Sequence, residues 1–230
     1  MSDASRAMPA ADARAIAAAF KPAHRLGNRY AYHYTRAKLA SDPLYPGVCA
    51  ALRGTTQPLL DIGCGMGLLA HALRRDGQAL AYRGVDADAR KLDSARTAAA
   101  RAGLQDVVFE HVDLEHGQPT HAGSVAILDV LQFIDPAAQV ATLDAAVAML
   151  APGARLVIRT GLDDGGGRAR VTRAVDAFSR VVGWMRSGPR AYPSRAVLQA
   201  RFNAAGLRST FAPLHGKTPF NNWLVVASRD

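Results

Sequence analysis

The nine residues LLDIGCGMG, at positions 59–67, decide the fold of this chain. An apolar run with an acidic residue leads into a Gly-x-Gly-x-Gly turn, and residues 68–75 then show the apolar spacing of a helix. Glycines in such a turn let the backbone approach a ligand and adopt angles that a Cβ atom forbids. The stretch therefore predicts a buried strand, a ligand-binding turn and the start of a helix.

Outward from this turn, strands and helices alternate with short connections. Strands are expected at 57–62, 80–85, 107–111, 125–129 and 154–160, with a closing hairpin at 207–213 and 222–228. Helices are expected at 68–75, 89–102, 136–150, 168–186 and 194–205, and Asp88 is placed to cap the second of them. This alternation predicts an α/β fold with a mostly parallel sheet that is covered on both faces.

We expect one domain over residues 1–230, divided into four parts. Residues 1–54 precede the first strand and are expected to form an N-terminal helical lid, and residues 55–161 form the cofactor-binding core. Residues 162–206 are expected to be a helical cap insertion, and residues 207–230 to be the closing strands.

Two common ligands of glycine-rich turns fit this turn poorly. A dinucleotide fingerprint needs Gly or Ala where Leu68 stands, and a phosphate-binding P-loop needs Gly-Lys-Ser/Thr. The pattern Asp-x-Gly-x-Gly-x-Gly instead resembles the first motif of class I S-adenosylmethionine-dependent methyltransferases. The resemblance covers residues 55–161. It implies S-adenosyl-L-methionine as the cofactor and a Rossmann-like three-layer sandwich, whose seven-stranded sheet has an antiparallel last strand.

Later motifs follow in the order that this family has. Asp86 ends the second expected strand, 19 residues after Gly67, where a carboxylate can accept hydrogen bonds from both ribose hydroxyls. The segments 111–114 (HVDL) and 128–133 (LDVLQF) resemble the family's adenine-binding site and its fourth motif. The resemblance implies these cofactor-binding residues: Asp61, Gly63, Cys64, Gly65, Gly67, Asp86, Ala87, Asp113, Leu114, Asp129, Val130 and Arg36, the last as a partner of the methionine carboxylate.

Candidates for acceptor binding and catalysis lie around and outside this core. The aromatic segment 29–36 (RYAYHYTR) can form a lid or simply pack its tyrosines on the domain. The segment 32–47 also resembles methyltransferases of bacterial aryl-polyene and pigment biosynthesis. The substrate candidates are Tyr32, Phe133, Trp184 and Tyr192, and the catalytic candidates are Gln132, His33 and His215, although a lone histidine is more often structural.

The composition is that of a soluble globular protein with an uneven distribution of charge. The formal net charge is +9, and residues 168–208 alone hold nine arginines and one acid, Asp176. This segment can reflect genome composition, or it can attract an anionic substrate or an acidic acyl carrier protein. Two cysteines exclude a disulfide framework, and no apolar run reaches the roughly 18 residues of a membrane span. We expect a cytoplasmic protein without a bound metal.

These observations predict methyl transfer to a small-molecule acceptor that is aromatic or anionic and is free or carrier-bound. The arginine-rich segment keeps RNA open as an alternative substrate, but no RNA-binding module is recognisable and the fourth motif lacks Asn/Asp-Pro-Pro-Tyr. A second alternative is a non-catalytic protein that binds the cofactor and docks a partner. A nicotinamide-dependent oxidoreductase fits least, because of Leu68.

Overall fold

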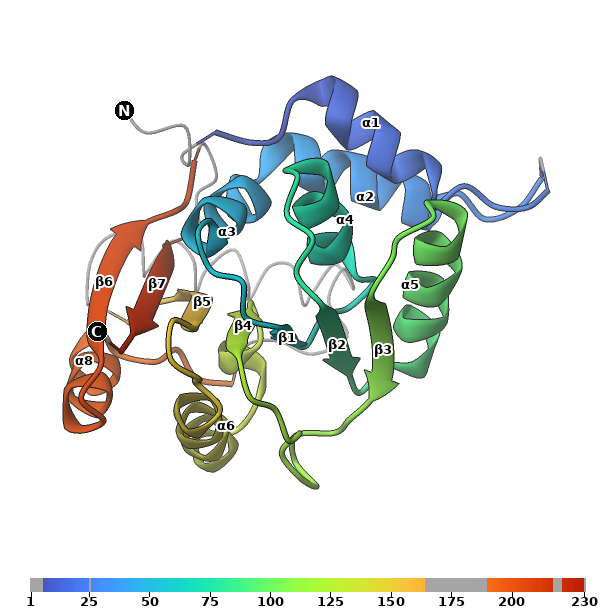
Figure 1. The fold of residues 1–230 in the computed structure, drawn as a ribbon. Coiled ribbons are helices and arrows are strands. Elements are labelled where there is room, and N and C mark those ends of the chain that lie inside the picture. Colours follow the sequence, from blue (N-terminus) through green and yellow to red (C-terminus); the bar gives the residue numbers. More distant parts are fainter. Residues whose placement is uncertain (1–5, 25, 164–189, 217–220, 230) are drawn as a thin grey trace.

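Seven strands form one mixed sheet in the computed structural model, which describes residues 6–24, 26–163, 190–216 and 221–229 (Figure 1). The strands lie in the order β3-β2-β1-β4-β5-β7-β6. Their bounds are β1 Leu59–Ile62, β2 Tyr82–Asp86, β3 Val107–His111, β4 Ser124–Leu128, β5 Arg155–Gly161, β6 Arg208–Pro213 and β7 Asn222–Ser228.

The pairing of these strands confirms the predicted fold class. Strands β1 to β5 pair in parallel, whereas β7 runs antiparallel to both β5 and β6. The strand order reverses direction between β1 and β4, both of which are central. In open α/β sheets, ligands bind at the carboxyl ends of the strands at such a switch point.

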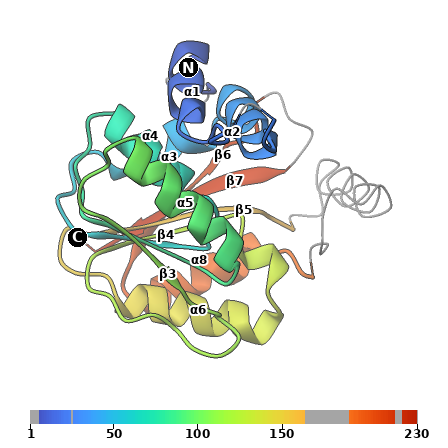
Figure 2. The same cartoon turned by 90° about the vertical axis from the view of Figure 1, so that its right-hand side faces the viewer.

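Helices cover both faces of this sheet (Figures 1 and 2). On one face lie α1 Ala10–Ala18, α2 Tyr30–Ser41, α3 Leu44–Leu52, α4 Leu68–Arg75 and α5 Ala89–Arg101. On the other face lie α6 Pro136–Ala148 and α8 Arg195–Ala204. The short 3-10 helix η2, Leu131–Phe133, follows β4. The helix expected at 168–186 lies outside the described residues.

Alternating side chains of the strands build a separate hydrophobic core on each face. Leu59 and Val157 belong to the core under α3, α4 and α5, whereas Leu60 and Ile158 belong to the core over α6 and α8. All four are fully buried. A strand that is buried on both faces reads as a continuous apolar run, which is why β1 and β5 could be recognised from sequence.

Side-chain caps fix where the helices of the core begin. The carboxylate of Asp88 accepts from the backbone N–H of Arg90 at 3.0 Å and caps α5, as predicted. Asp135 caps α6, which has Pro136 in its first turn, and Ser194 caps α8. Each cap satisfies an N–H group that the first helical turn leaves without a partner. Among the described helices, none combines the length and the apolar character that crossing a membrane would need.

Candidate active site

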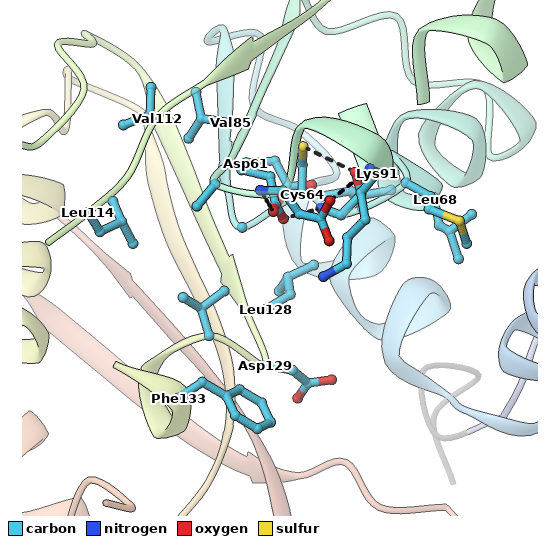
Figure 3. Close-up of a pocket in the computed structure, with 18 of the residues that line it drawn as sticks. Asp61, Cys64, Leu68, Val85, Lys91, Val112, Leu114, Leu128, Asp129 and Phe133 are labelled. Carbon is cyan, nitrogen blue, oxygen red and sulfur yellow. Dashed lines mark hydrogen bonds between the residues drawn. The ribbon is translucent and has the colours of Figure 1, made fainter. Parts of the chain in front are cut away.

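A cavity of about 1140 Å³ opens at the carboxyl ends of the parallel strands (Figure 3). Its walls come from the glycine turn after β1, the segments that follow β2, β3 and β4, and helices α2 and α3. Polar groups from the first three strands line one end, and aromatic and apolar side chains of α2, α3 and η2 line the other. We call these the cofactor end and the acceptor end.

The three glycines of the turn serve two different structural purposes. Each has a positive φ, between +55° and +73°. A Cβ atom on Gly63 would lie 2.2 Å from Val130, and one on Gly67 would lie 2.6 Å from the ring of Phe109. A Cβ atom on Gly65 would meet nothing within 4 Å, although Gly65 lines the cavity. Close packing therefore requires Gly63 and Gly67, whereas Gly65 leaves space at the cavity wall.

Asp86 ties the end of β2 to the glycine turn. One oxygen of its carboxylate accepts from the backbone N–H of Gly65 at 2.8 Å, and the other accepts from the N–H of Asp88 at 2.8 Å. A carboxylate can accept about four hydrogen bonds, so two acceptor positions remain. Asp86 lines the cofactor end together with Ala87. A pair of vicinal hydroxyls is the type of group that the remaining positions can bind.

Asp61 is a buried carboxylate without a cationic partner in the described part of the chain. The hydroxyl of Tyr82 donates to its Oδ2 atom at 2.6 Å, and among the described residues nothing donates to Oδ1. Burial raises the pKa of Asp61 to about 7, although the bond from Tyr82 acts in the opposite direction. Asp61 is 2 % exposed and lines the cavity. A ligand cation would supply the donor that Oδ1 lacks.

The loop after β3 brings two of the predicted cofactor residues, Asp113 and Leu114, to the same end of the cavity. Val112 precedes them on the wall, and its N–H donates to the carbonyl of Asp86 at 3.2 Å. Cys64 also lines the cavity, and burial raises the pKa of its thiol well above the usual range. This thiol therefore remains protonated and acts as a small apolar group.

Helix α2 contributes different residues from those predicted. Tyr30, Tyr34 and Lys38 line the cavity, whereas Arg36 is exposed and lies outside the lining. Tyr32 also lies outside it. Residues four apart share one face of a helix, and positions 32 and 36 lie on the opposite side from 30, 34 and 38. The spacing places Lys38 on the same face as Tyr30 and Tyr34, but it does not show which face of α2 meets the cavity.

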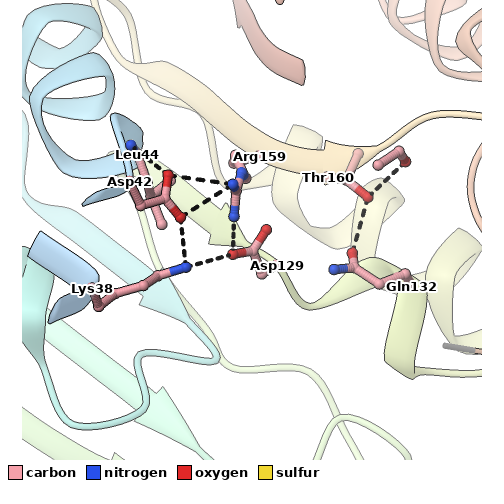
Figure 4. A network of polar contacts seen from close by, with 8 residues as sticks. Lys38, Asp42, Leu44, Asp129, Gln132, Arg159 and Thr160 are labelled. Atoms are coloured by element: carbon pink, nitrogen blue, oxygen red, sulfur yellow. Dashed lines mark hydrogen bonds and ion pairs between the residues drawn. The ribbon is translucent and has the colours of Figure 1, made fainter. Parts of the chain in front are cut away.

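Four charged side chains join α2 to the central strands at the acceptor end (Figure 4). The ammonium of Lys38 lies 2.7 Å from Asp42 and 3.6 Å from Oδ2 of Asp129. The guanidinium of Arg159 contacts Asp42 at 3.2 Å and also donates to Oδ2 of Asp129. We call these four residues the charged network. Sequence analysis missed three of them, although an arginine inside the apolar run of β5 indicates a buried ion pair.

Mutual attraction keeps Lys38, Asp42 and Arg159 ionised despite their burial. Burial disfavours the cationic form of Lys38, but Asp129 and Asp42 outweigh this effect and hold its pKa above the usual value. Burial likewise disfavours the anionic form of Asp42, but Arg159 and Lys38 hold its pKa below the usual value. The pKa of Arg159 is raised, because Asp129 and Asp42 outweigh its burial. Oppositely charged partners at these distances produce such shifts.

The remaining candidates for catalysis and acceptor binding are spread over the molecule. Phe133 lines the acceptor end, whereas Gln132 is buried outside the lining and its side-chain oxygen accepts from Thr160 at 3.0 Å. His33 is exposed beside Tyr32, and no histidine lines the cavity among the described residues. His215, after β6, and Tyr192, whose ring lies against Gly161, are also outside the lining. Trp184 lies outside the described residues.

The described arginines of the 168–208 segment have partners within the chain. Arg190 pairs with Glu115 at 2.9 Å, and Arg201 pairs with Asp144. Arg195 lies over the rings of Phe211 and Trp223, and Arg208 also has a contact. The other five arginines of the segment lie outside the described residues.

Comparison with known proteins agrees with this geometry. Residues 59–153 match the family described as "Methyltransferase domain", which is less than half of the chain. A ubiquinone biosynthesis O-methyltransferase of Psychrobacter arcticus is 36 % identical over 107 residues, 44 % of this chain and 40 % of that protein. The match therefore spans well under half the length of this curated relative.

Solved structures extend the likeness of the fold to almost the whole chain. Magnesium protoporphyrin IX methyltransferase from Synechocystis PCC 6803, solved with bound S-adenosylhomocysteine, has a TM-score of 0.62 at 17 % identity and covers 93 % of this chain and 92 % of its own. The pyocyanin biosynthetic protein PhzM has a TM-score of 0.63 at 17 % identity, over 93 % of this chain and 61 % of its own. Residues 59–153 therefore match a methyltransferase domain, and the solved structures extend the likeness of the fold, but not of the sequence, to almost the whole chain.

Proposed function

We propose that this chain transfers the methyl group of S-adenosylmethionine to a small aromatic acceptor. The observation that carries the proposal is the continuity of the cavity: a polar end suited to an adenosyl group opens into an end lined by Tyr34, Tyr45 and Phe133. Cofactor and acceptor would meet beside Asp129, between the two ends. A cavity of this kind, apolar with a few convergent polar groups, is typical of a small-molecule site.

Three features of the cofactor end fit S-adenosylmethionine. Gly65 leaves open space where any other residue would place a side chain, so an adenosyl group can lie against the turn. Asp86 keeps acceptor positions that suit the ribose hydroxyls. Asp61 has a buried oxygen that needs a donor, and the amino group of the cofactor is a cationic donor. The cofactor would be held by these residues together with the loop at 112–114.

The chain would act mainly by positioning the reactants and excluding water. The cofactor supplies an activated methyl group, so the protein needs no strong nucleophile of its own. Holding two reactants in line can contribute on the order of 7–11 kcal/mol to lowering the barrier. The absence of histidine from the described lining is compatible with this mode of action. His33, His215 and Gln132 are accordingly given no catalytic role in the proposal.

The acceptor class rests on the side chains of the acceptor end. Leu44, Tyr45 and Phe133 line this end with apolar surface, and Tyr34 of α2 also lines it. Burial raises the pKa of both Tyr34 and Tyr45, so neither phenol ionises near neutral pH. Such a surface favours a planar apolar body. The relative from Psychrobacter arcticus is an O-methyltransferase of ubiquinone biosynthesis, which supports oxygen as the methylated atom.

An acyl carrier protein as the bearer of the acceptor remains a prediction from sequence. It depends on the arginines of the 168–208 segment, and the described members of that set already have partners within the chain. Charge reversal at Arg173, Arg180 and Arg186 would test it. Activity on a carrier-bound acceptor should fall while activity on the same free acid persists, and equal loss on both would exclude the carrier.

Calorimetry with S-adenosylhomocysteine tests the proposed function directly. The wild-type protein should bind this product, and Asp86→Ala should weaken binding at least thirtyfold, because both ribose hydroxyls lose their acceptor. Asp93→Ala is the matched control, since Asp93 is an exposed acid of α5 that pairs only with Arg96 in the described structure. No heat of binding with the wild-type protein would refute the proposal. Binding without methyl transfer to any aromatic acceptor would favour the non-catalytic alternative.

A further inference from the structure

The backbone at Asp129 is unusual and draws attention to its side chain. Asp129 has φ +59°, and it is one of two non-glycine residues with a positive φ in the described ranges. This conformation costs energy for any residue with a Cβ atom, and it recurs at functional sites. It turns the chain sharply after β4, where the side chain lines the cavity next to Phe133 (Figure 3). The carboxylate is thus held at the cavity wall by its backbone.

Only one oxygen of this carboxylate is used by the charged network. Oδ2 receives the guanidinium of Arg159 and lies 3.6 Å from the ammonium of Lys38 (Figure 4). Among the described residues, no donor reaches Oδ1. The side chain of Asp129 is 26 % exposed, in contrast to 4 % for Arg159. Asp129 therefore has one oxygen fixed by the network and one that can accept from a ligand in the cavity.

The ammonium of Lys38 keeps an N–H donor for a ligand, just as Asp129 keeps an acceptor. An ammonium has three N–H donors. Asp42 accepts from one of them at 2.7 Å, and the more distant Asp129, at 3.6 Å, accounts for a second. The side chain of Lys38 is 24 % exposed and lines the same cavity. A third donor therefore remains for a ligand. An open acceptor and an open donor, a few ångströms apart, match a hydroxyl group, which donates one hydrogen bond and accepts others.

We propose that Lys38 and Asp129 together bind the acceptor hydroxyl that is methylated. This inference rests on the proposed function and names the residues that select and orient the acceptor. The hydroxyl donates its proton to Oδ1 of Asp129, and its oxygen accepts from the ammonium of Lys38. Arg159 and Asp42 are positioning residues, because they hold the two catalytic groups without touching the acceptor.

The pair also provides for the charges that appear during transfer. A lone pair of the hydroxyl oxygen forms the new bond to the methyl carbon, and the electrons of the broken carbon–sulfur bond return to sulfur, which becomes a neutral thioether. The hydroxyl proton passes to the carboxylate of Asp129 and then to solvent. The ammonium of Lys38 stabilises the negative charge that develops on oxygen before the new bond is complete. An amine nitrogen has a single lone pair, which cannot both accept from Lys38 and attack the methyl carbon, whereas a hydroxyl oxygen has two.

Matched pairs of aromatic probes test this assignment. The pairs are 2-naphthol with 2-naphthylamine, catechol with 1,2-phenylenediamine, and 4-hydroxybenzoate with 4-aminobenzoate, each incubated with S-adenosylmethionine. Mass spectrometry of the products should show methylation of hydroxyls at least tenfold faster than of the matched amines. Asp129→Asn should lower kcat/KM for the best hydroxyl probe at least a hundredfold. Lys38→Met should lower it at least tenfold, and Lys38→Arg should restore part of the loss.

Both substitutions are chosen so that the protein can fold. Asparagine tolerates a positive φ, and methionine keeps the apolar stem of lysine. Asp76→Asn and Arg53→Met are the matched controls, because they break an ion pair between the ends of α3 and α4, outside the cavity lining. They should leave kcat/KM within twofold. The affinity of Asp129→Asn and Lys38→Met for S-adenosylhomocysteine should stay within threefold of wild type.

Three results would overturn the assignment and leave the proposed function standing. The first is wild-type methylation of only the amines while S-adenosylhomocysteine binds. The second is an unchanged kcat/KM in both variants. The third is a loss of S-adenosylhomocysteine affinity in Lys38→Met that accounts for its loss of activity, which would make Lys38 a partner of the methionine carboxylate instead. Failure of the proposed function is distinct from these, because the wild-type protein would then bind no S-adenosylhomocysteine, or would bind it and methylate none of the probes.

Discussion

The two ends of the cavity are built from the chain in opposite ways. The cofactor end is assembled from short segments that each follow a strand, namely 61–67, 86–88 and 112–114. The acceptor end joins Lys38 and Asp42, which precede the sheet, to Asp129 and Arg159, about ninety to a hundred and twenty residues later. The first is a set of local motifs, and the second exists only once the end of α2 has come to lie beside Asp129 and Arg159.

This difference has a physical consequence for how each end can fail. At the cofactor end, the backbone of a tight turn determines the shape of the site, so added side-chain volume should abolish binding. At the acceptor end, charges hold one another in place. Removing one member of a buried ion pair leaves its partners without compensation, which costs more than the pair itself contributes to stability.

Removal of Arg159 should have the largest effect and would break the acceptor end alone. Arg159→Met leaves Asp42 and Asp129 with only Lys38 to compensate two carboxylates. We expect the free energy of unfolding to fall by about 3–5 kcal/mol, the usual range for breaking a buried pair. Urea denaturation measures this change. Under conditions in which the variant is folded, its affinity for S-adenosylhomocysteine should differ from wild type by less than tenfold.

Arg155→Met is the control for that substitution. Arg155 lies on the same strand, is only partly buried, and donates to the backbone carbonyl of Ala51 and not to a carboxylate. Its loss should cost about 1 kcal/mol, the net contribution of a typical hydrogen bond. Equal destabilisation by the two substitutions would show that the charged network has no special energetic role.

A side chain on Gly65 should have the next largest effect and would break the cofactor end alone. Gly65→Val should weaken S-adenosylhomocysteine binding at least a hundredfold, about 2.7 kcal/mol, because its side chain would occupy the space of the ligand. Gly103→Val is a closely matched control. Gly103 has φ +63° and, like Gly65 with φ +55°, would place its Cβ atom in open space. Both variants should lose similar stability, but only Gly65→Val should lose affinity in calorimetry.

The same difference explains what could be predicted from the sequence. Strands β3 and β7 and helix α4 were predicted at their observed bounds, because apolar periodicity and turn residues are local signals. The cavity residues at 61, 63, 65, 86 and 113 lie within such motifs. Arg36 was predicted and Lys38 was missed, because the sequence of one helix does not show which of its faces meets the cavity. Residues 1–54 were expected to be helical, but no bounds were predicted for α3, whose first turn contains and tolerates Pro46.

Two buried titratable groups, Asp61 and His71, should change the free energy of unfolding with pH in opposite directions. Asp61 has a pKa of about 7 in the folded state, above its ordinary value of 3.8, so its contribution is present at acidic pH and is lost as pH rises toward 7. His71 has a pKa lowered by burial to about 4, from 6.5, so its contribution is lost as pH falls from 6.5 to 4. Between pH 4.5 and 6.5 the two effects oppose each other.

Single substitutions should expose each of these slopes. On going from pH 6.5 to pH 4.5, His71→Phe should gain about 2 kcal/mol of stability relative to wild type. The wild-type protein loses stability in this interval because His71 becomes protonated in the unfolded chain but not in the folded one, and the variant lacks this group. Asp61→Asn should lose about 2 kcal/mol relative to wild type over the same interval. The folded wild-type protein is stabilised when Asp61 takes up a proton, and the variant lacks this effect. Chemical denaturation at the two pH values gives both differences. Shifts of the same sign in the two variants would contradict the opposing roles.

The smallest expected effect concerns the hydroxyl of Tyr82 and sharpens the role of Asp61 in cofactor binding. Tyr82→Phe keeps the ring that packs edge-on against Phe109 at 5.8 Å but removes the only described donor to Asp61. The pKa of Asp61 should then rise further above 7, because that bond favours the carboxylate. A cationic amino group binds the carboxylate and not the neutral acid. Affinity for S-adenosylhomocysteine at pH 7 should therefore fall by about threefold to tenfold. A rise of one unit in the pKa of Asp61 corresponds to roughly 1.4 kcal/mol, or about tenfold.

Calorimetry at pH 6, 7 and 8 separates this effect from a general disturbance of the site. The wild-type affinity should increase from pH 6 to pH 8, and the curve for Tyr82→Phe should be displaced toward higher pH, so that the two proteins differ least at pH 8. Tyr32→Phe, which changes a tyrosine outside the cavity lining, should follow the wild-type curve. A loss of affinity in Tyr82→Phe that is the same at every pH would mean that Tyr82 shapes the site and does not set the charge of Asp61. The shape of the cofactor end around Asp61 would then depend on the packing of Tyr82 from β2, just as the acceptor end depends on residues distant in the sequence.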